Sequence, residues 1–223
     1  MLIGNSSAWL KAIIDIDKKV IECVVRVWPS VISRLSQREK EDNITQRLVD
    51  CLREDRVIYE FGFIDIHFKL REQDCIGDYS TKGILDMALF LEQDYETYIA
   101  YECKRLNIVS DKGKRTASLA GAYVEEGVVR YVTAKYSEKL PYGCMLGYVM
   151  DGDAAFAFQQ LNAAIVKRKK LISLKNESIS LLHREFPEFE TTHARQSDKA
   201  IFTVRHRLLS MRPGGQALAV YSQ

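Results

Sequence analysis

The feature that most constrains the fold is the stretch from Gly83 to Leu106, which reads GILDMALFLEQDYETYIAYECKRL. It contains two short apolar runs, both rich in β-branched and aromatic residues, on either side of the polar segment Glu92-Gln93-Asp94. Such runs, bounded by turn-forming residues, are typical of two strands joined by a turn. The sequence therefore predicts a β-hairpin over this stretch.

The predicted hairpin brings three ionisable residues together. A turn centred on Asp94 pairs Asp86 with Glu102, which puts both side chains on one face with Cβ atoms roughly 5 Å apart. Lys104 lies two residues beyond Glu102 and, by strand alternation, on the same face. Two facing carboxylates repel each other unless a cation lies between them, and Mg²⁺ prefers oxygen ligands of this kind. We therefore expect a metal site here.

The residue between the acid and the lysine adds a further oxygen. Cys103 points to the opposite face as a small hydrophobic residue, but its backbone carbonyl can serve as a metal ligand. A lysine beside a metal-bound water can orient or deprotonate that water, or stabilise charge on a phosphoryl group, which suits phosphodiester hydrolysis. The alternative is a structural hairpin, in which Glu102 and Lys104 form an ion pair and Asp86 caps a bend.

The order Asp86, then Glu102-Cys103-Lys104 after a turn, resembles the D…(D/E)xK signature of the PD-(D/E)XK nuclease superfamily, which includes many restriction and repair endonucleases. Leu85 stands where members often have proline. The resemblance covers roughly residues 36 to 170. It implies an α/β fold of the restriction-endonuclease-like kind, with a mixed central β-sheet flanked by helices. It also implies Mg²⁺, with Mn²⁺ as a substitute, held by Asp86, Glu102 and the Cys103 carbonyl, while Lys104 acts on the attacking water.

A fourth site residue is expected on a helix before the hairpin. Capping-box spacing from Ser36 to Glu39 predicts a helix that begins there and runs to about Arg53. Glu41 shares the inward face of this helix. In the superfamily the first helix often supplies an acidic residue, and Glu41 matches that role by placement, with Asp42 second. The alternative, that both acids only favour the positive end of the helix dipole, stays open.

Basic residues gather around the end of the second hairpin strand and the predicted start of a helix at Arg115. Since helix N-termini and cations attract phosphate, this group predicts a nucleic-acid-binding cradle for the scissile phosphate. A solvated basic loop is the alternative. The members of the group are Arg105, Lys112, Lys114 and Arg115. His193 and His206 are interpreted as surface histidines, although an approach to a phosphate or to each other is also considered.

Periodicity and punctuation predict the remaining elements. We expect a helix over 7–27 that ends or kinks at Trp28-Pro29, a strand over 56–71, a polar loop over 72–82, a strand over 142–150, a helix over 153–170, and two strands around a turn at 196–198. Residues 1–35 are interpreted as an N-terminal helical extension and residues 36–223 as the nuclease-like α/β domain.

Composition limits the function classes. A net charge of +2 means that any nucleic-acid contact must come from local patches. The five cysteines contain no CxxC pair, which argues against a disulfide framework or a zinc site and for a reducing compartment. Lys11 and Asp15 precede any long apolar run, so we expect neither a signal peptide nor a membrane span, and a cytoplasmic protein.

These observations favour a Mg²⁺-dependent nuclease that acts on DNA in preference to RNA. The segment GAYVEEGVVRYVTAKYSEKLPYGCMLGYVMDG is similar to superfamily members in bacterial defence gene clusters, which implies a role in anti-phage defence or restriction. One rival is a non-catalytic nucleic-acid-binding or scaffolding subunit of an ATPase or helicase complex. Because the chain has no glycine-rich phosphate loop, any nucleotide-driven motor would be a partner. Another is a hydrolase of a small phosphate ester. The first helix is a candidate homodimer interface.

Overall fold

The computed structural model describes residues 6–73, 78–92, 97–137, 140–176, 178–182 and 187–212. Its centre is a six-stranded sheet in the order β1-β2-β3-β6-β8-β7. The strands β1 to β3 form an antiparallel meander, β6 lies parallel to both β3 and β8, and β7 is antiparallel to β8. The strands are β1 (Phe63–Gln73), β2 (Tyr79–Phe90), β3 (Tyr98–Leu106), β6 (Tyr142–Val149), β7 (Glu188–Ala194) and β8 (Ile201–Ser210). The mixed α/β class predicted from the sequence is confirmed.

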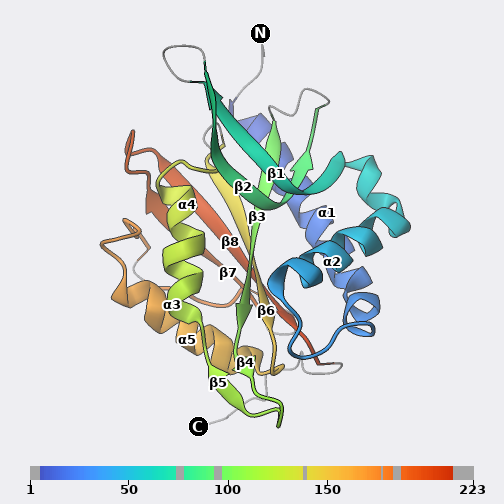
Figure 1. Cartoon of the computed structure of the whole chain (residues 1–223). Helices are drawn as coiled ribbons and strands as arrows, with labels where there is room; N and C mark the ends of the chain where they lie inside the picture. Colours follow the sequence, from blue (N-terminus) through green and yellow to red (C-terminus); the bar gives the residue numbers. More distant parts are fainter. Residues whose placement is uncertain are drawn as a thin grey trace.

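Helices cover both faces of the sheet (Figure 1). On one face lie α1 (Ser6–Ile32) and α2 (Glu41–Asp55); on the other lie α3 (Ala120–Ala122), the π-turn η2 (Tyr123–Val128), α4 (Val129–Val132) and α5 (Ala154–Lys167). Two apolar clusters fill these layers, one containing Trp28 and Leu48 and the other Tyr131 and Leu161. Smaller elements are the 3₁₀ turn η1 (Val57–Glu60) and a separate ladder of β4 (Ile108–Val109) with β5 (Arg115–Ala117).

The predicted hairpin is present as β2 and β3. Met87 pairs with Tyr101 and Phe90 with Tyr98, which is the register that a turn centred on Asp94 gives. Asp94 itself belongs to residues 93–96, outside the described residues. The predicted strand β6, helix α5 and the pair β7–β8 are also confirmed, since periodic burial against a sheet produces the patterns that the sequence shows.

One predicted helix boundary is wrong, and for another the structure excludes one of the two expected outcomes, an end at Trp28-Pro29. The first helix does not end at Trp28-Pro29 but continues through Pro29 to Ile32, because Trp28 and Val31 are buried in the core and the Trp28 indole donates to the Ser210 carbonyl at 2.6 Å. The second helix begins at Glu41 rather than at Ser36. Ser36 does bond Glu39, at 3.3 Å, but within a turn that precedes the helix.

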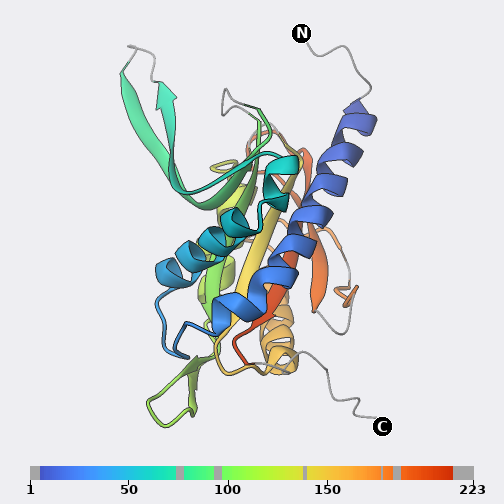
Figure 2. The same cartoon turned by 90° about the vertical axis from the view of Figure 1, so that its right-hand side faces the viewer.

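Three further segments differ from prediction. Most of the expected polar loop at 72–82 is strand, because Glu72 pairs with Ser80 across a long β1–β2 ribbon; residues 74–77 lie outside the described ranges. Figure 2 shows this ribbon projecting from the rest of the sheet. Residues 57–60 form η1 rather than strand, and the helix expected from Arg115 begins at Ala120, since residues 115–117 pair with β4 instead.

The described cysteines are free thiols in the core. Cys23, Cys51, Cys103 and Cys144 are buried free thiols, while Cys75 lies outside the described residues. Within the described ranges, none of the helices has the length and apolar character that a bilayer crossing requires. Thiols buried in this way act as small hydrophobic residues in the core.

Helix α1 is held to the sheet by a buried charge. Asp17 is fully buried and forms an ion pair with Arg205 of β8 at 2.7 Å. Its carboxylate also accepts hydrogen bonds from the hydroxyls of Tyr101 and Tyr142, at 2.8 and 2.7 Å. The helix and the sheet therefore share one core, and the domain boundary near residue 35 stays a prediction.

We expect Asp17→Ala to lower the free energy of unfolding by about 3–5 kcal/mol, because it leaves the buried Arg205 guanidinium without its main partner. Asp15→Ala, two residues away on the exposed side of the helix, should change stability by less than about 0.5 kcal/mol. Urea denaturation followed by circular dichroism measures both. Equal losses in the two variants would contradict this interpretation of Asp17.

The interpretation of His193 and His206 as surface residues is wrong, because both are fully buried. Thr191 joins them: its hydroxyl lies 2.7 Å from His193 Nε2 and 2.8 Å from His206 Nε2. This row of hydrogen bonds extends on one side to the Ile172 carbonyl, which is bound to His193 Nδ1. On the other side it extends to the Tyr123 hydroxyl, which is bound to His206 Nδ1. Burial lowers the pKa of His193 to about 4 and holds the pKa of His206 well below its ordinary value.

These two histidines make the free energy of unfolding depend on pH. The unfolded chain takes up protons as the pH falls below about 6.5, whereas the folded chain does not, so the free energy of unfolding falls between pH 6.5 and 4. For His193 the loss is on the order of 3 kcal/mol. Denaturation of the wild type and of His193→Gln at pH 7.5 and pH 5 measures it. The variant should show the weaker pH dependence; an unchanged dependence would contradict the prediction.

Candidate functional site

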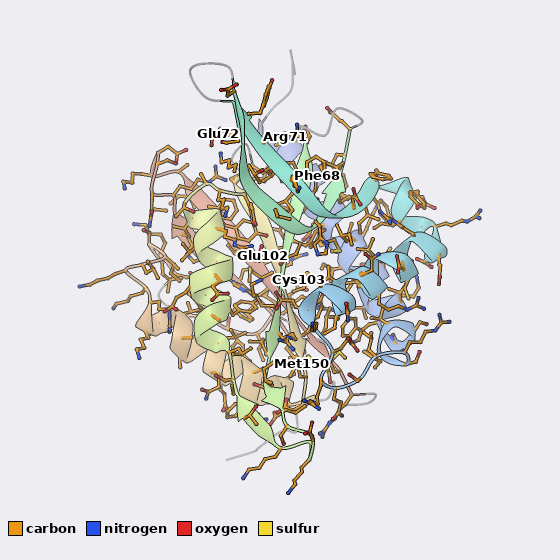
Figure 3. The ribbon with its side chains drawn as sticks, viewed as in Figure 1. Phe68, Arg71, Glu72, Glu102, Cys103 and Met150 are labelled. Atoms are coloured by element: carbon orange, nitrogen blue, oxygen red, sulfur yellow. The ribbon has the colours of Figure 1, made fainter. Side chains whose placement is uncertain are left out.

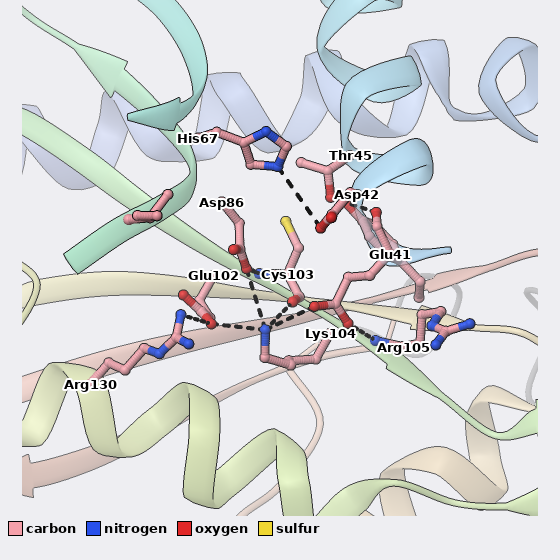
Figure 4. Close-up of polar contacts among 12 residues, drawn as sticks. Glu41, Asp42, Thr45, His67, Asp86, Glu102, Cys103, Lys104, Arg105 and Arg130 are labelled. Atoms are coloured by element: carbon pink, nitrogen blue, oxygen red, sulfur yellow. Dashed lines mark hydrogen bonds and ion pairs between the residues drawn. The ribbon is translucent and has the colours of Figure 1, made fainter. Parts of the chain in front are cut away.

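The site forms where strand β2 leaves strand β3. Their last pair is Met87 with Tyr101, so the N–H groups of Cys103 and Arg105, which face the same edge, have no β2 partner. Asp86 accepts the Cys103 N–H at 2.8 Å, and Glu41, from the first turn of α2, accepts the Arg105 N–H at 2.9 Å. Backbone donors of the open strand edge therefore fix both carboxylates (Figure 4).

The ammonium of Lys104 lies at the centre of the site. Its Nζ is 2.9 Å from an oxygen of Glu41 and 2.9 Å from an oxygen of Glu102. It is also 2.8 Å from the Cys103 carbonyl and 3.4 Å from Asp86 (Figure 4). Burial by itself lowers the pKa of Lys104, but the neighbouring carboxylates outweigh burial and hold that pKa above its ordinary value. The structure thus gathers every residue of the predicted metal site around one positive charge.

Glu102 is a fully buried member of the site, at 0% exposure. Its Oε1 accepts hydrogen bonds from Arg130, at 2.6 Å, and lies next to Lys104, but its buried Oε2 has no hydrogen-bond partner. Burial, and then the charge of Asp86, raise the pKa of Glu102 to about 7, although Lys104 and Arg130 oppose the shift. A buried carboxylate oxygen without a partner is costly, which makes Oε2 a good ligand for a cation.

Sequence reasoning missed Arg130, which α4 brings to Glu102. Its Nη1 also binds the Tyr136 hydroxyl at 2.9 Å. A signal was present, because Arg130 follows Gly127 by three residues and Tyr123 by seven and so shares their inward helical face. Gly127 belongs to the π-turn and allows the close approach: a Cβ there would lie 2.3 Å from the Met145 methyl carbon. Short π-helical segments between α-helical turns often occur at functional sites.

The donor set fits a hard divalent cation. Among the residues that the structure describes, no three His, Cys, Asp or Glu side chains form a group that could hold a metal ion. The oxygens of Asp86, Glu102 and the Cys103 carbonyl surround an ammonium instead. Because all three are hard oxygen donors, and because Glu102 Oε2 has no other partner, these residues fit Mg²⁺ or Mn²⁺.

The four basic residues of the predicted phosphate cradle have different surroundings, and the cradle stays a prediction. Arg105 adjoins the site, and its guanidinium donates to the Glu39 carbonyl at 3.1 Å. The Arg115 guanidinium pairs with Asp151 and with Asp153, and lies over the ring of Phe156. Lys112 and Lys114 are exposed at the turn between β4 and β5, beyond the end of β3 (Figure 1).

The opposite rim of the site comes from β1 and α2. His67 of β1 has φ of +50°, a left-handed conformation that costs an L-residue on the order of 1 kcal/mol. Its Nε2 lies 3.9 Å from the carboxylate of Asp42, the acid that the sequence offered as an alternative to Glu41. Figure 4 shows the imidazole ring on the same side of the hairpin as Asp86. Sequence reasoning missed His67, because the pairing of β1 with β2 was not predicted.

Comparison of the chain with protein-family models, with curated proteins and with solved structures finds no match. A functional assignment therefore depends on the chemistry of the site. Figure 3 shows Glu102 and Cys103 near the middle of the molecule, with Arg71 and Glu72 at the outer part of the β1–β2 ribbon.

We expect Glu102→Gln to stabilise the metal-free protein at alkaline pH. The folded state keeps a proton on Glu102 up to about pH 7, whereas the unfolded state releases it near pH 4.5, so wild-type stability falls as the pH rises through this window. Denaturation in EDTA should show the variant about 1–3 kcal/mol more stable relative to wild type at pH 8.5 than at pH 5. A difference independent of pH would contradict the assigned cause.

Proposed function

We propose that the chain is a metal-dependent nuclease that hydrolyses phosphodiester bonds, of DNA in preference to RNA, on a restriction-endonuclease-like fold. The observation that carries the proposal is the set of oxygens from Glu41, Asp86, Glu102 and Cys103 around the Lys104 ammonium. Three carboxylates and a lysine, which come from the antiparallel strands β2 and β3 and from the first turn of α2, are an arrangement suited to phosphoryl transfer with a bound cation.

The residues divide the chemical work. Asp86, Glu102 and the Cys103 carbonyl would hold Mg²⁺, with Mn²⁺ as a substitute. When bound, the cation supplies an activated water and neutralises charge on the phosphoryl group. Lys104 carries three N–H donors and no acceptor, so it orients the attacking water or a phosphoryl oxygen. Glu41 positions Lys104, and Arg130 holds Oε1 of Glu102, which leaves Oε2 for the cation.

The surroundings of the site favour a long polyanion over a small phosphate ester. A hollow of about 160 Å³ beside the β1–β2 ribbon is lined by three cations, Arg71, Lys82 and Lys135, and by one acid, Glu72. An excess of cations suits the phosphates of a polymer, and the binding of such a polymer weakens as salt rises. A role in restriction or anti-phage defence belongs to the same proposal and is supported by the sequence resemblance.

The test is cleavage of supercoiled, linear and single-stranded DNA, and of RNA, with Mg²⁺, Mn²⁺ or EDTA. Asp86→Asn and Lys104→Ala should each slow cleavage by about 100-fold or more, because each removes a group from the reacting centre. Lys175→Ala, an exposed substitution outside the site, is the matched control and should cut at the wild-type rate.

Calorimetric titration with Mn²⁺ gives a readout that does not depend on activity. The wild type should bind Mn²⁺, and Asp86→Asn should bind it more weakly, since one oxygen ligand has lost its charge. No cutting of any substrate together with no metal binding would overturn the nuclease proposal. Tight DNA binding without cutting would favour a subunit that acts with an ATPase or helicase partner.

A further inference from the structure

His67 occupies a place that the ladder of β1 and β2 defines. Ile66 pairs with Met87 and Phe68 with Leu85, so His67 lies directly across from Asp86. It adopts φ of +50° in the middle of a strand, a conformation that glycine or asparagine adopts more readily. Strained non-glycine residues persist where the surrounding structure holds them, and they cluster at active sites. The strained residue here adjoins the proposed metal ligand Asp86.

The imidazole of His67 is accessible to a bound molecule. Its side chain is 46% exposed, and its Nε2 is 3.9 Å from Asp42 of α2. Figure 4 shows the ring at the rim of the site, on the side of Asp86 and Asp42. The buried residues His193 and His206 are committed to hydrogen bonds at both ring nitrogens, so of these three histidines only His67 can exchange a proton with a ligand at the site.

Hydrolysis of a phosphodiester leaves one chemical task that the residues assigned so far do not perform. The water oxygen forms a bond to phosphorus and releases a proton to solvent. The bond from phosphorus to the leaving oxygen breaks, and the leaving oxygen takes the electron pair and needs a proton. Lys104 is assigned above to the attacking water or a phosphoryl oxygen, its ammonium is bound to the carboxylates, and the Arg130 guanidinium does not release a proton. A proton donor on the opposite rim would complete the reaction.

We propose that His67 is a catalytic residue that donates its Nε2 proton to the leaving oxygen of the phosphodiester, with Asp42 orienting the ring. The imidazole then recovers a proton from solvent. This role rests on the proposed nuclease function and adds a residue to it.

The experiment compares two substrates that differ in one atom. One is a DNA duplex that the wild type cuts, and the other carries sulfur in place of the leaving oxygen, in separate 3′- and 5′-bridging forms. A thiolate leaves without protonation, so it does not need a proton donor. His67→Asn keeps a residue that tolerates positive φ. It should slow the oxygen substrate by about 100-fold and the matching sulfur substrate by less than about threefold.

The controls separate the two proposals. Lys69 is also exposed and lies two residues after His67 on β1. The Lys69→Asn variant should cut both substrates at wild-type rates. If His67→Asn slows both substrates equally, or slows neither, the role of His67 is overturned while the nuclease proposal stands. If the wild type cuts no nucleic acid and binds no Mn²⁺, the nuclease proposal fails and the role of His67 fails with it.

A second variant tests His67 without any substrate. His67→Gly removes the strained side chain and should raise the midpoint of thermal unfolding by a few degrees in EDTA. It should also lose cleavage of the oxygen substrate selectively, as His67→Asn does. Equal losses of cleavage on the oxygen and the sulfur substrates would overturn the assignment of His67 as a catalytic residue.

Discussion

The site depends on one backbone constraint, the parting of strands β2 and β3 after the pair Met87–Tyr101. Buried or half-buried N–H groups need acceptors, and the parting deprives β3 of those that β2 would supply. Asp86 and Glu41 satisfy the N–H groups of Cys103 and Arg105 instead. The same hydrogen bonds that repair the strand edge therefore hold two carboxylates beside Lys104, and the remaining features of the site follow from this placement.

Strand β3 contributes a side chain to a charged cluster on each face of the sheet. The hydroxyl of Tyr101 meets the buried ion pair of Asp17 and Arg205 beneath α1, while the next residue, Glu102, meets Arg130 of α4 on the other face. Alternation along a strand makes this division inevitable. In the first cluster both carboxylate oxygens of Asp17 accept hydrogen bonds, and the cluster anchors a helix. The other leaves Glu102 Oε2 without a partner, a cost that is understandable if the oxygen serves a ligand.

The buried histidines His193 and His206 and the exposed His67 have different surroundings and therefore different roles. The chain through His193, Thr191 and His206 satisfies the ring nitrogens in the core, where burial keeps both rings neutral. His67 has the opposite surroundings: an exposed ring, a strained backbone and an acidic neighbour. Residue type alone is the same in all three, so only their positions in the fold distinguish a core hydrogen-bond chain from a group at the reacting centre.

The sequence by itself determined the β2–β3 hairpin, its register, the mixed α/β class and the grouping of Asp86, Glu102 and Lys104, because alternation and turn chemistry are local properties. It also pointed to Glu41 through helical periodicity. Only the tertiary structure decided that Arg130 and His67 lie at the site, that Arg115 pairs with Asp151, and that His193 and His206 are buried. Those outcomes depend on contacts between segments far apart in the chain, which local patterns do not encode.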